Sequence, residues 1–334
     1  MKTQVVYALK ASKNDFFIEE MWASIYSLRL YEPNREVRVV CDSNTCSLIK
    51  QNEELLQLIT EVIPVEVPSL FNNAKLISRQ LKTTIRDFIK GRFLFVDTDT
   101  IFCGTLEYID NLSCDIAATL EYHLPLSFSP FKQNVYRIMG SVFGIDIVQN
   151  DYWFNSGVLF VNDTDLTYEF YKRWNNNWKY SAFEKDMSQD QPGFMKTNID
   201  LENIVCELPG IYNCQPAMSV KHFADARIIH FLHMFFPRNR SFSPFMDKSI
   251  YKQIHVDGGI TDITAVIIKD VKSSFSSPSC IVGEDTLRFL SSPIEPIFER
   301  IYKDGGPASF LMIKVARFLQ VLHDFLKKIN ICGE

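Results

Sequence analysis

Residues 93–102 read Phe-Leu-Phe-Val-Asp97-Thr98-Asp99-Thr100-Ile-Phe, an apolar run that meets two aspartates one residue apart. In an extended strand the side-chain period is two, so Asp97 and Asp99 are predicted to point to one side and Thr98 to the other. Two carboxylates on one face repel each other unless a cation joins them, and ligands of open α/β sheets bind beyond the carboxyl ends of strands. The stretch therefore predicts a site for Mg2+ or Mn2+, which proteins hold through one or two carboxylates together with substrate phosphate oxygens. The alternative is a strand that runs into an Asp-rich turn.

The residues before this stretch alternate between strand-like and helix-like patterns. Such alternation implies an α/β fold with a mainly parallel sheet and right-handed crossovers. No Gly-x-Gly-x-x-Gly follows the first strand and no Gly-Lys-Ser/Thr loop occurs, which disfavours dinucleotide-binding and P-loop proteins. The expected strands are 4–9, 37–41 and 61–67, and the expected helices are 17–30, 46–58 and 78–90.

Beyond Asp99 the pattern continues with expected strands at 116–120 and 157–161 and an expected helix at 166–178. Trp174 and Trp178 lie four residues apart on that helix and are predicted to be core residues. The tripeptide Asn155-Ser156-Gly157 precedes an apolar run, where it forms either a plain turn or a polar loop that presents an amide at a strand start. His230 ends another apolar run, Ile228-Ile229-His230, and a histidine in that place is either structural or a ligand.

Composition narrows the class of protein. The 334 residues are 46% hydrophobic and 22% charged, which is typical of a globular chain. The net charge of -5 argues against a general nucleic-acid binder, because affinity for the phosphate backbone depends on lysine and arginine. We expect no signal peptide and no spanning helix, and hence a cytoplasmic protein. The eight cysteines show no Cys-x-x-Cys spacing and are expected to be free, buried thiols.

Six short motifs, taken in order, resemble the family-eight glycosyltransferases of the GT-A fold over roughly residues 1–240. The resemblance implies a sugar-nucleotide donor, commonly linked to UDP, a Mn2+ ion and retention of the anomeric configuration. The motifs are Asp97 to Thr100, Ala117-Ala118-Thr119-Leu120-Glu121, Phe154 to Leu159, Gln189-Asp190-Gln191, Leu208 to Asn213 and Ile228 to Phe231.

Residue roles follow from that resemblance alone. It makes Asp97, Asp99 and His230 the metal ligands, and it places Asp190 and Gln191 nearest the reacting anomeric carbon. Transfer from a diphosphate needs a cation at the leaving group and anionic or polar groups near the oxocarbenium-like sugar, which these residue types supply. The residues that the resemblance assigns to donor binding are Lys82, Arg79, Asp97, Glu121, Asn155 and Gly157.

The sequence departs from the family pattern in two places. The family commonly has a glycine and then Lys-Pro-Trp after its metal histidine, whereas this chain has His233 and Phe236-Pro237-Arg238. Either His230 or His233 is then the third metal ligand, and Arg238, Arg240 or Lys221 would replace the missing lysine that holds the diphosphate. The loop in which the family often has an aspartate that contacts uracil reads Leu9-Lys10-Ala11-Ser12 in this chain.

Two other classes of function remain open. A haloacid-dehalogenase-like phosphatase also has an apolar strand before Asp-x-Asp, but that family places Thr or Val where this chain has Ile101, and its motif usually opens the domain. A non-catalytic relative that binds sugar nucleotides is the second alternative. For an active enzyme we expect transfer to a glycan or glycolipid acceptor, with front-face attack favoured over a covalent intermediate on Asp190. No motif is recognisable in the loops around 127–145, where specificity is expected to lie.

The expected domains are a glycosyltransferase domain over 1–240, divided into a nucleotide-binding half (1–102) and a donor and acceptor half (103–240), and a largely helical extension over 241–334. Within the extension, 273–279 reads as a loop and 287–302 as a broken helix. Residues 308–331 interleave apolar side chains with Lys314, Arg317, Lys327 and Lys328. This segment is expected to be a helix that either lies peripherally on the inner face of a membrane or packs on the catalytic domain or in a homodimer contact.

Overall fold

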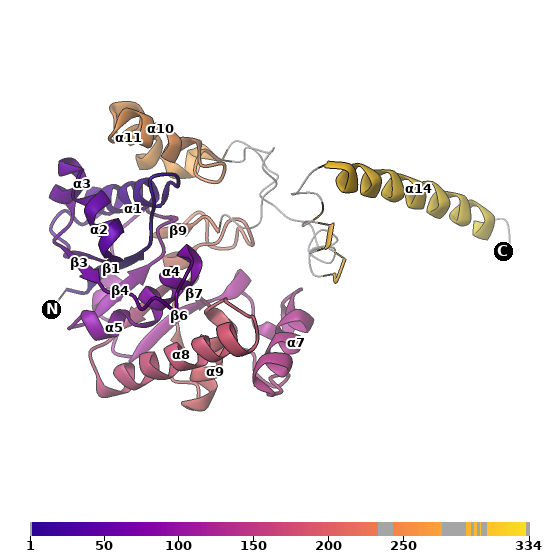
Figure 1. Ribbon diagram of the computed structural model, residues 1–334, viewed down its shortest axis with the longest axis horizontal. Coiled ribbons are helices and arrows are strands. Elements are labelled where there is room, and N and C mark those ends of the chain that lie inside the picture. Colours follow the sequence, from indigo (N-terminus) through magenta and orange to yellow (C-terminus); the bar gives the residue numbers. More distant parts are fainter. Residues whose placement is uncertain are drawn as a thin grey trace. The chain divides into compact units, whose positions relative to one another are not determined.

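The structure is a computed structural model that describes residues 2–232, 243–275, 292–294, 297–298, 301 and 306–331, with side chains of the last helix described to residue 322. The chain forms two compact units, Met1–Val282 and Gly283–Glu334. Figure 1 shows both, coloured along the sequence. The first unit contains the sheet and every candidate site residue that the structure describes.

A seven-stranded sheet with the order β3-β2-β1-β4-β7-β6-β8 forms the centre of the first unit. Its neighbouring strands are parallel except β7, which runs antiparallel to both β4 and β6. The expected α/β class with a mainly parallel, mixed sheet is therefore confirmed. A two-stranded antiparallel sheet pairs β5 with β9. The strands are β1 (Gln4–Leu9), β2 (Val37–Asp42), β3 (Glu61–Val65), β4 (Phe93–Val96), β5 (Thr100–Phe102), β6 (Ile116–Leu120), β7 (Phe154–Val161), β8 (Val205–Glu207) and β9 (Ile228–His230).

Helices cover both faces of the large sheet, because its strands are apolar on both sides (Figure 1). Alternate side chains enter separate cores: Leu94 and Val96 of β4 pack on the face of α1 (Phe17–Tyr31), and Phe93 and Phe95 pack on the opposite face. Trp174 and Trp178 of α8 (Asp165–Glu184) are fully buried in the second core, which confirms the expected core role.

Helices form where the sequence predicts them, but two of the expected helices are each divided into two shorter ones that the apolar spacing did not indicate. The expected helix over 46–58 is two helices, because Asn52 caps the second one by accepting a hydrogen bond from the Leu55 backbone N–H. The expected helix over 78–90 is likewise two. The remaining α-helices in the described part of the first unit are α2 (Ser43–Ile49), α3 (Glu53–Leu58), α4 (Ala74–Thr83), α5 (Ile85–Phe88), α6 (Glu107–Asp110), α7 (Lys132–Phe143), α9 (Gln191–Asp200), α10 (Ser249–Asp257) and α11 (Asp262–Lys269).

The first unit reaches beyond the expected boundary at residue 240. Helices α10 and α11 pack against α1, and Lys248, directly before α10, pairs with the buried Glu20 carboxylate of α1 at 2.9 Å. The other carboxylate oxygen of Glu20 accepts a hydrogen bond from Thr98 at 3.1 Å. Residues after 240 therefore support the turn that carries Asp97 and Asp99.

The second unit contains α14 (Gly306–Ile331), which agrees with the helix expected over 308–331. In the described residues, no helix combines the length and the apolar character that crossing a membrane requires. Most of the expected broken helix over 287–302 and the end of the expected loop over 273–279 lie outside the described residues.

The described cysteines are free thiols, as expected. Cys41, Cys46 and Cys214 are buried, but Cys103 and Cys114 are half-buried and Cys206 is exposed, so the expectation of burial holds for only part of the set. Cys280 and Cys332 lie outside the described residues.

Candidate functional site

Asp97, Asp99 and His230 form a cluster in which one ligand atom of each residue lies within 4.8 Å of the others. The prediction of how the two aspartates come together was wrong. Strand β4 ends at Val96, and Asp97 to Asp99 form a turn before β5, so strand periodicity does not align the two carboxylates. The tight turn brings them together instead, and Thr98 does point elsewhere, toward Glu20.

Strand pairing carries His230 to this turn from far along the chain. Strands β5 and β9 are antiparallel and place His230 opposite Thr100, and the Phe231 backbone N–H donates to the Asp99 carbonyl at 3.0 Å. Antiparallel β7 begins at the edge of the sheet where β4 and β6 end. The start of β7 therefore meets the carboxyl ends of its neighbours, and the Asp97 backbone N–H donates to the Gly157 carbonyl at 2.7 Å.

The chemistry of this cluster fits a hard divalent cation. His230 Nε2 lies 3.2 Å from Asp99 Oδ1 and 4.0 Å from Asp97 Oδ2. Burial raises the pKa of Asp97, although Lys82 and His230 oppose the shift. Burial would lower the pKa of His230, but Asp99 and Asp97 outweigh it and raise this pKa above its ordinary value. Two carboxylates with an imidazole are a donor set that Mn2+ accepts.

Gly157 lies directly beneath the cluster. A Cβ atom at this position would fall 2.2 Å from His230 Cε1 and 2.9 Å from Asp97 Oδ2. Since real side chains do not approach so closely, only glycine lets the imidazole and the carboxylate occupy their present places.

Two basic residues of α4 connect the cluster to Asp190. Lys82 Nζ is buried and lies 3.3 Å from Asp97 Oδ1 and 3.3 Å from Asp190 Oδ2, while Arg79 Nε lies 3.0 Å from Asp190 Oδ1. Ser156 donates to Asp190 Oδ2 at 2.8 Å. Burial raises the pKa of Asp190, but Arg79 and Lys82 outweigh burial and hold this pKa well below its usual range. Asp190 is therefore ionised at neutral pH.

Asp190 is held in place by the junction of α8 and α9. It directly precedes α9, and its backbone carbonyl accepts a hydrogen bond from Trp174 Nε1 at 3.0 Å. Gly193 lets the two helices approach closely, because a Cβ there would lie 2.9 Å from the Trp178 backbone nitrogen. The buried tryptophans thus contribute to the site through the backbone that they fix.

Glu121, Asn155 and Gln191 form the polar group on the other side of the cluster. Glu121 Oε2 accepts hydrogen bonds from Asn155 Nδ2 at 3.0 Å and from Gln191 Nε2 at 2.7 Å. Burial raises the pKa of Glu121, which these two bonds partly oppose. A buried carboxylate surrounded by amide groups is suited to binding hydroxyl groups.

Asn213 joins the two halves of the site. Its Nδ2 donates to Asn155 Oδ1 at 2.9 Å, and its Oδ1 lies 3.0 Å from His230 Nδ1. The residues predicted for metal and donor binding and for catalysis therefore lie in one connected network. Asn213 and Ser156 stood within the quoted motifs but received no role, because neither pattern nor composition distinguishes a buried linking side chain from an ordinary turn residue.

A second polar cluster borders Glu121 and was not anticipated. Tyr122 and His123 have φ values of 59° and 56°, so the chain turns through a strained backbone region directly after Glu121. His123 Nε2 accepts from the Gln215 backbone N–H at 3.3 Å, and the His123 and His222 rings are 4.7 Å apart. Burial lowers the pKa of His123 to about 4, with the same direction of effect from His222 and Lys221, so its ring is neutral at pH 7.

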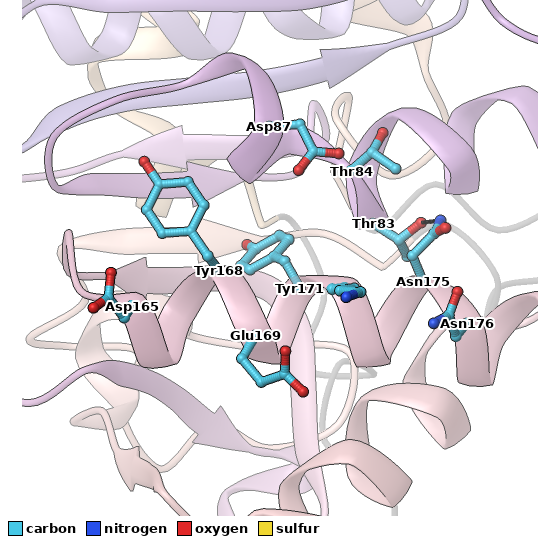
Figure 2. Close-up of a pocket in the computed structure, with 10 residues that line it drawn as sticks. Thr83, Thr84, Asp87, Asp165, Tyr168, Glu169, Tyr171, Asn175 and Asn176 are labelled. Carbon is cyan, nitrogen blue, oxygen red and sulfur yellow. Dashed lines mark hydrogen bonds between the residues drawn. The ribbon is translucent and has the colours of Figure 1, made fainter.

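A groove of about 360 Å³ is lined by none of the residues predicted for metal binding, donor binding or catalysis. It lies between α8 on one side and the end of α4 together with α5 on the other (Figure 2). Asn175 in its wall donates to Gln80 Oε1 at 3.1 Å and to Thr83 Oγ1 at 2.8 Å. Both acceptors belong to α4, so this contact holds the helix that carries Arg79 and Lys82. The residues that line the groove are Thr83, Thr84, Asp87, Asp165, Tyr168, Glu169, Tyr171, Lys172, Asn175 and Asn176.

Several alternatives raised by the sequence lie outside the described residues, namely His233, Arg238 and Arg240. Lys221 is described and exposed, and its charge acts on His123 and His222. In the loop after β1, Lys10 Nζ pairs with Asp42 Oδ2 at 3.0 Å. The roles predicted for His233, Arg238, Arg240 and Lys221 remain predictions.

Comparisons with known proteins place the chain beside solved glycosyltransferases at low similarity. No protein-family model matches the sequence, and no curated protein matches it. Mouse xyloside xylosyltransferase 1 is 14% identical, with 70% of this chain and 99% of that chain covered and a TM-score of 0.47. The glycosyltransferase GlyE of Streptococcus pneumoniae TIGR4 is 17% identical (82% and 65% covered, TM-score 0.49). The galactosyltransferase LgtC, solved with donor and acceptor sugar analogues, is 14% identical (85% and 98% covered, TM-score 0.47). Similarity at this level assigns no residue, substrate or activity to the present chain.

Proposed function

We propose that this chain is a metal-dependent glycosyltransferase that moves a hexose-type sugar from a nucleotide-diphosphate donor, with UDP favoured, to a glycan or glycolipid acceptor with retention of configuration. The observation that carries the proposal is the connected network of the site. It links the cluster of Asp97, Asp99 and His230, whose side chains suit a cation, through Lys82 to Asp190, and through Asn213 to the Glu121 group. A donor with a diphosphate at one end and a sugar at the other requires both kinds of group side by side.

Asp97, Asp99 and His230 would hold Mn2+ or Mg2+ in this proposal. The bound cation would neutralise negative charge on the diphosphate leaving group. Lys82 and Arg79 add two positive charges beside the same cluster, where they favour binding of the phosphates. The burial of Lys82 strengthens its effect, because the site has a lower effective dielectric constant than water.

The sugar end of the donor would contact Glu121, Asn155 and Gln191. Their carboxylate and amide groups match the hydroxyls of a hexose in hydrogen-bonding character. Asp190, held ionised by Arg79 and Lys82, would stabilise positive charge that develops at the anomeric carbon. Both of its oxygens are already engaged by Arg79, Lys82 and Ser156, so electrostatic stabilisation is favoured over covalent attack by this carboxylate.

Retention follows if the acceptor attacks from the side of the leaving group. The bond between the anomeric carbon and the phosphate oxygen breaks, the bond to the acceptor oxygen forms, and the acceptor proton moves to the departing phosphate oxygen. No protein base is needed for that transfer. This route agrees with the low pKa of Asp190, which makes it a poor proton acceptor.

Calorimetric titration of nucleotide diphosphates tests the proposal first. We expect UDP to bind in the presence of Mn2+ and its affinity to fall at least about tenfold when the metal is chelated, because the cluster and the diphosphate share the cation. Donor hydrolysis measured in parallel separates an active enzyme from a binding protein without activity. Failure of every nucleotide to bind under both conditions would contradict the proposal, and phosphatase activity would then be assayed.

We also propose that α14 lies on an anionic membrane surface, which would bring the site to a glycolipid acceptor. Its apolar side chains are exposed: Phe310, Phe318 and Val321 are 62%, 66% and 68% exposed. Residues 306–331 contain four lysines and arginines and one acidic residue, Asp324. An apolar helix face flanked by positive charge matches the interface of a bilayer that contains anionic lipids.

Phe318→Asp is expected to lower binding to vesicles of phosphatidylglycerol and phosphatidylcholine by about thirtyfold, because the transfer of one aromatic side chain contributes about 2 kcal/mol. Co-sedimentation measures this effect. Ile263→Asp on α11 is the matched control, since Ile263 is 75% exposed and lies in the first unit. Equal binding by both variants would contradict the proposal. Light scattering would then show whether the apolar face forms a homodimer instead.

A further inference from the structure

Asn213 occupies a buried position between the metal-type cluster and the sugar-type group. It ends the short 3-10 helix Gly210–Asn213 and is fully buried. Its two amide atoms contact different partners, since Nδ2 lies 2.9 Å from Asn155 Oδ1 and Oδ1 lies 3.0 Å from His230 Nδ1.

Donors and acceptors can be assigned along the series of hydrogen bonds that runs from Gly157 through Asn155 and Asn213 to His230, because a backbone N–H can only donate. The Gly157 backbone N–H can only donate, and it donates to Asn155 Oδ1 at 2.9 Å, which identifies that atom as the oxygen. Asn155 Nδ2 then donates to the Glu121 carboxylate, which is consistent with the same orientation. Because Asn155 Oδ1 is an acceptor, the Asn213 atom facing it must be the donor nitrogen.

The other amide atom of Asn213 is consequently an oxygen and accepts from His230. We infer that Asn213 is a positioning residue that holds the ring proton of His230 on Nδ1, so that the lone pair of Nε2 would be available to a cation held between this nitrogen and the Asp97 and Asp99 carboxylates. The inference rests on the proposed metal site and deepens it. A backbone amide of β7 thus determines, through two side-chain amides, which nitrogen of a distant histidine is available to a cation.

Loss of the Asn213 oxygen should weaken the cluster without removing a ligand. His230 Nδ1 would have no acceptor at this buried place, and the tautomer with its proton on Nε2 would become competitive. That tautomer presents an N–H, and no lone pair, to the cation. Partners that orient metal-binding histidines typically contribute about 10- to 100-fold to metal affinity.

Binding of Mn2+ by three variants tests the inference. The free Mn2+ signal in electron paramagnetic resonance is followed during titration with UDP present, against a protein-free titration of the same composition. Asn213→Leu keeps the branching and the number of side-chain heavy atoms and loses the acceptor, so we expect affinity to fall about 10- to 100-fold. Asn213→Asp loses the donor to Asn155 but keeps an acceptor for His230 Nδ1, so it should bind Mn2+ within about threefold of the wild type if that acceptor is what matters.

Asn198→Leu is the matched control. Asn198 is also a fully buried amide, and it accepts from the Val205 backbone N–H at 2.9 Å, away from the cluster. Its replacement should lower the thermal midpoint and leave Mn2+ affinity unchanged. Equal Mn2+ binding by the wild type and Asn213→Leu would overturn the inference alone, whereas failure of the wild type to bind Mn2+ would overturn the proposed metal site and the inference with it.

A measurement on the wild type avoids dependence on whether Asn213→Leu folds. In protein labelled with 15N-histidine and loaded with Mg2+, long-range 15N–1H spectra distinguish the two neutral tautomers, and His230→Gln assigns the signal. We expect the proton on Nδ1. A proton on Nε2 would overturn the inference directly.

Discussion

Asparagine in place of Asp99 is expected to reduce metal-dependent sugar transfer by about a thousandfold or more. The substitution keeps the shape of the side chain and removes one of two carboxylates from the donor set of Asp97, Asp99 and His230. A cation that stabilises the leaving group contributes several kcal/mol, and each 1.36 kcal/mol of barrier corresponds to about tenfold in rate. Initial rates with the donor identified by the nucleotide screen would measure the effect.

The fold should tolerate Asp99→Asn, because Phe231 bonds to the backbone carbonyl of this residue and not to its side chain. Asp200→Asn is the matched control, since Asp200 pairs with Lys196 on the surface of α9. We expect the control to keep normal rates. Near-normal transfer by a folded Asp99→Asn protein would show that this cluster is not the catalytic metal site.

Asparagine in place of Asp190 is expected to lower both activity and stability. Arg79 and Lys82 would lose the anion that they share, and breaking a buried ion pair typically destabilises a protein by about 3 kcal/mol or more. The loss of negative charge beside the reacting carbon should reduce transfer by about a hundredfold or more. Urea unfolding and initial rates measure the two effects separately.

The stability difference for Asp190→Asn should depend on pH. The folded-state pKa of Asp190 lies below its ordinary value of about 3.9, so its ionised form stabilises the folded state fully above about pH 4. Below that pH the unfolded state takes up the proton first, and the advantage of the wild type declines. We therefore expect a smaller gap in unfolding free energy at pH 3 than at pH 7, and a constant gap would contradict this account.

Asp163→Asn provides the comparison for activity. Asp163 pairs with the fully buried Arg86 beside α8, so its loss also removes the partner of a buried cation. This variant should be destabilised yet keep its specific activity below its thermal midpoint. If Asp163→Asn and Asp190→Asn lost activity in parallel, the effect of Asp190 would be one of stability only.

The sheet and its class could be predicted from the sequence because its strands are short apolar runs with buried faces on both sides. Local breaks were harder to predict. The expected helix over 46–58 continues the apolar spacing across Asn52, and only the cap formed by that side chain divides it. Helix α7 was missed in the loops around 127–145, although Val135, Ile138, Met139 and Val142 have the spacing of one buried helix face.

The candidate site was predictable to the extent that its residues follow apolar runs. Asp97, Asp99 and His230 share that feature, since each lies at the end of a strand or just beyond it. The sequence gives no signal for Asn213, whose importance comes from two partners at positions 155 and 230. Nor does a sequence show that a turn, and not strand alternation, aligns the two carboxylates.

The contact beneath the cluster offers a criterion for distant chains of this architecture. Because Gly157 has no side chain, the His230 imidazole and the Asp97 carboxylate can both lie against its Cα atom. Residues from three separate segments of the chain therefore pack together at this position. A homologous chain that keeps both aspartates and the histidine but carries a larger residue here would have to shift its β7 backbone or forgo the histidine as a ligand. The residue at position 157 therefore distinguishes chains that keep the geometry of the cluster from chains that keep only its three residue types.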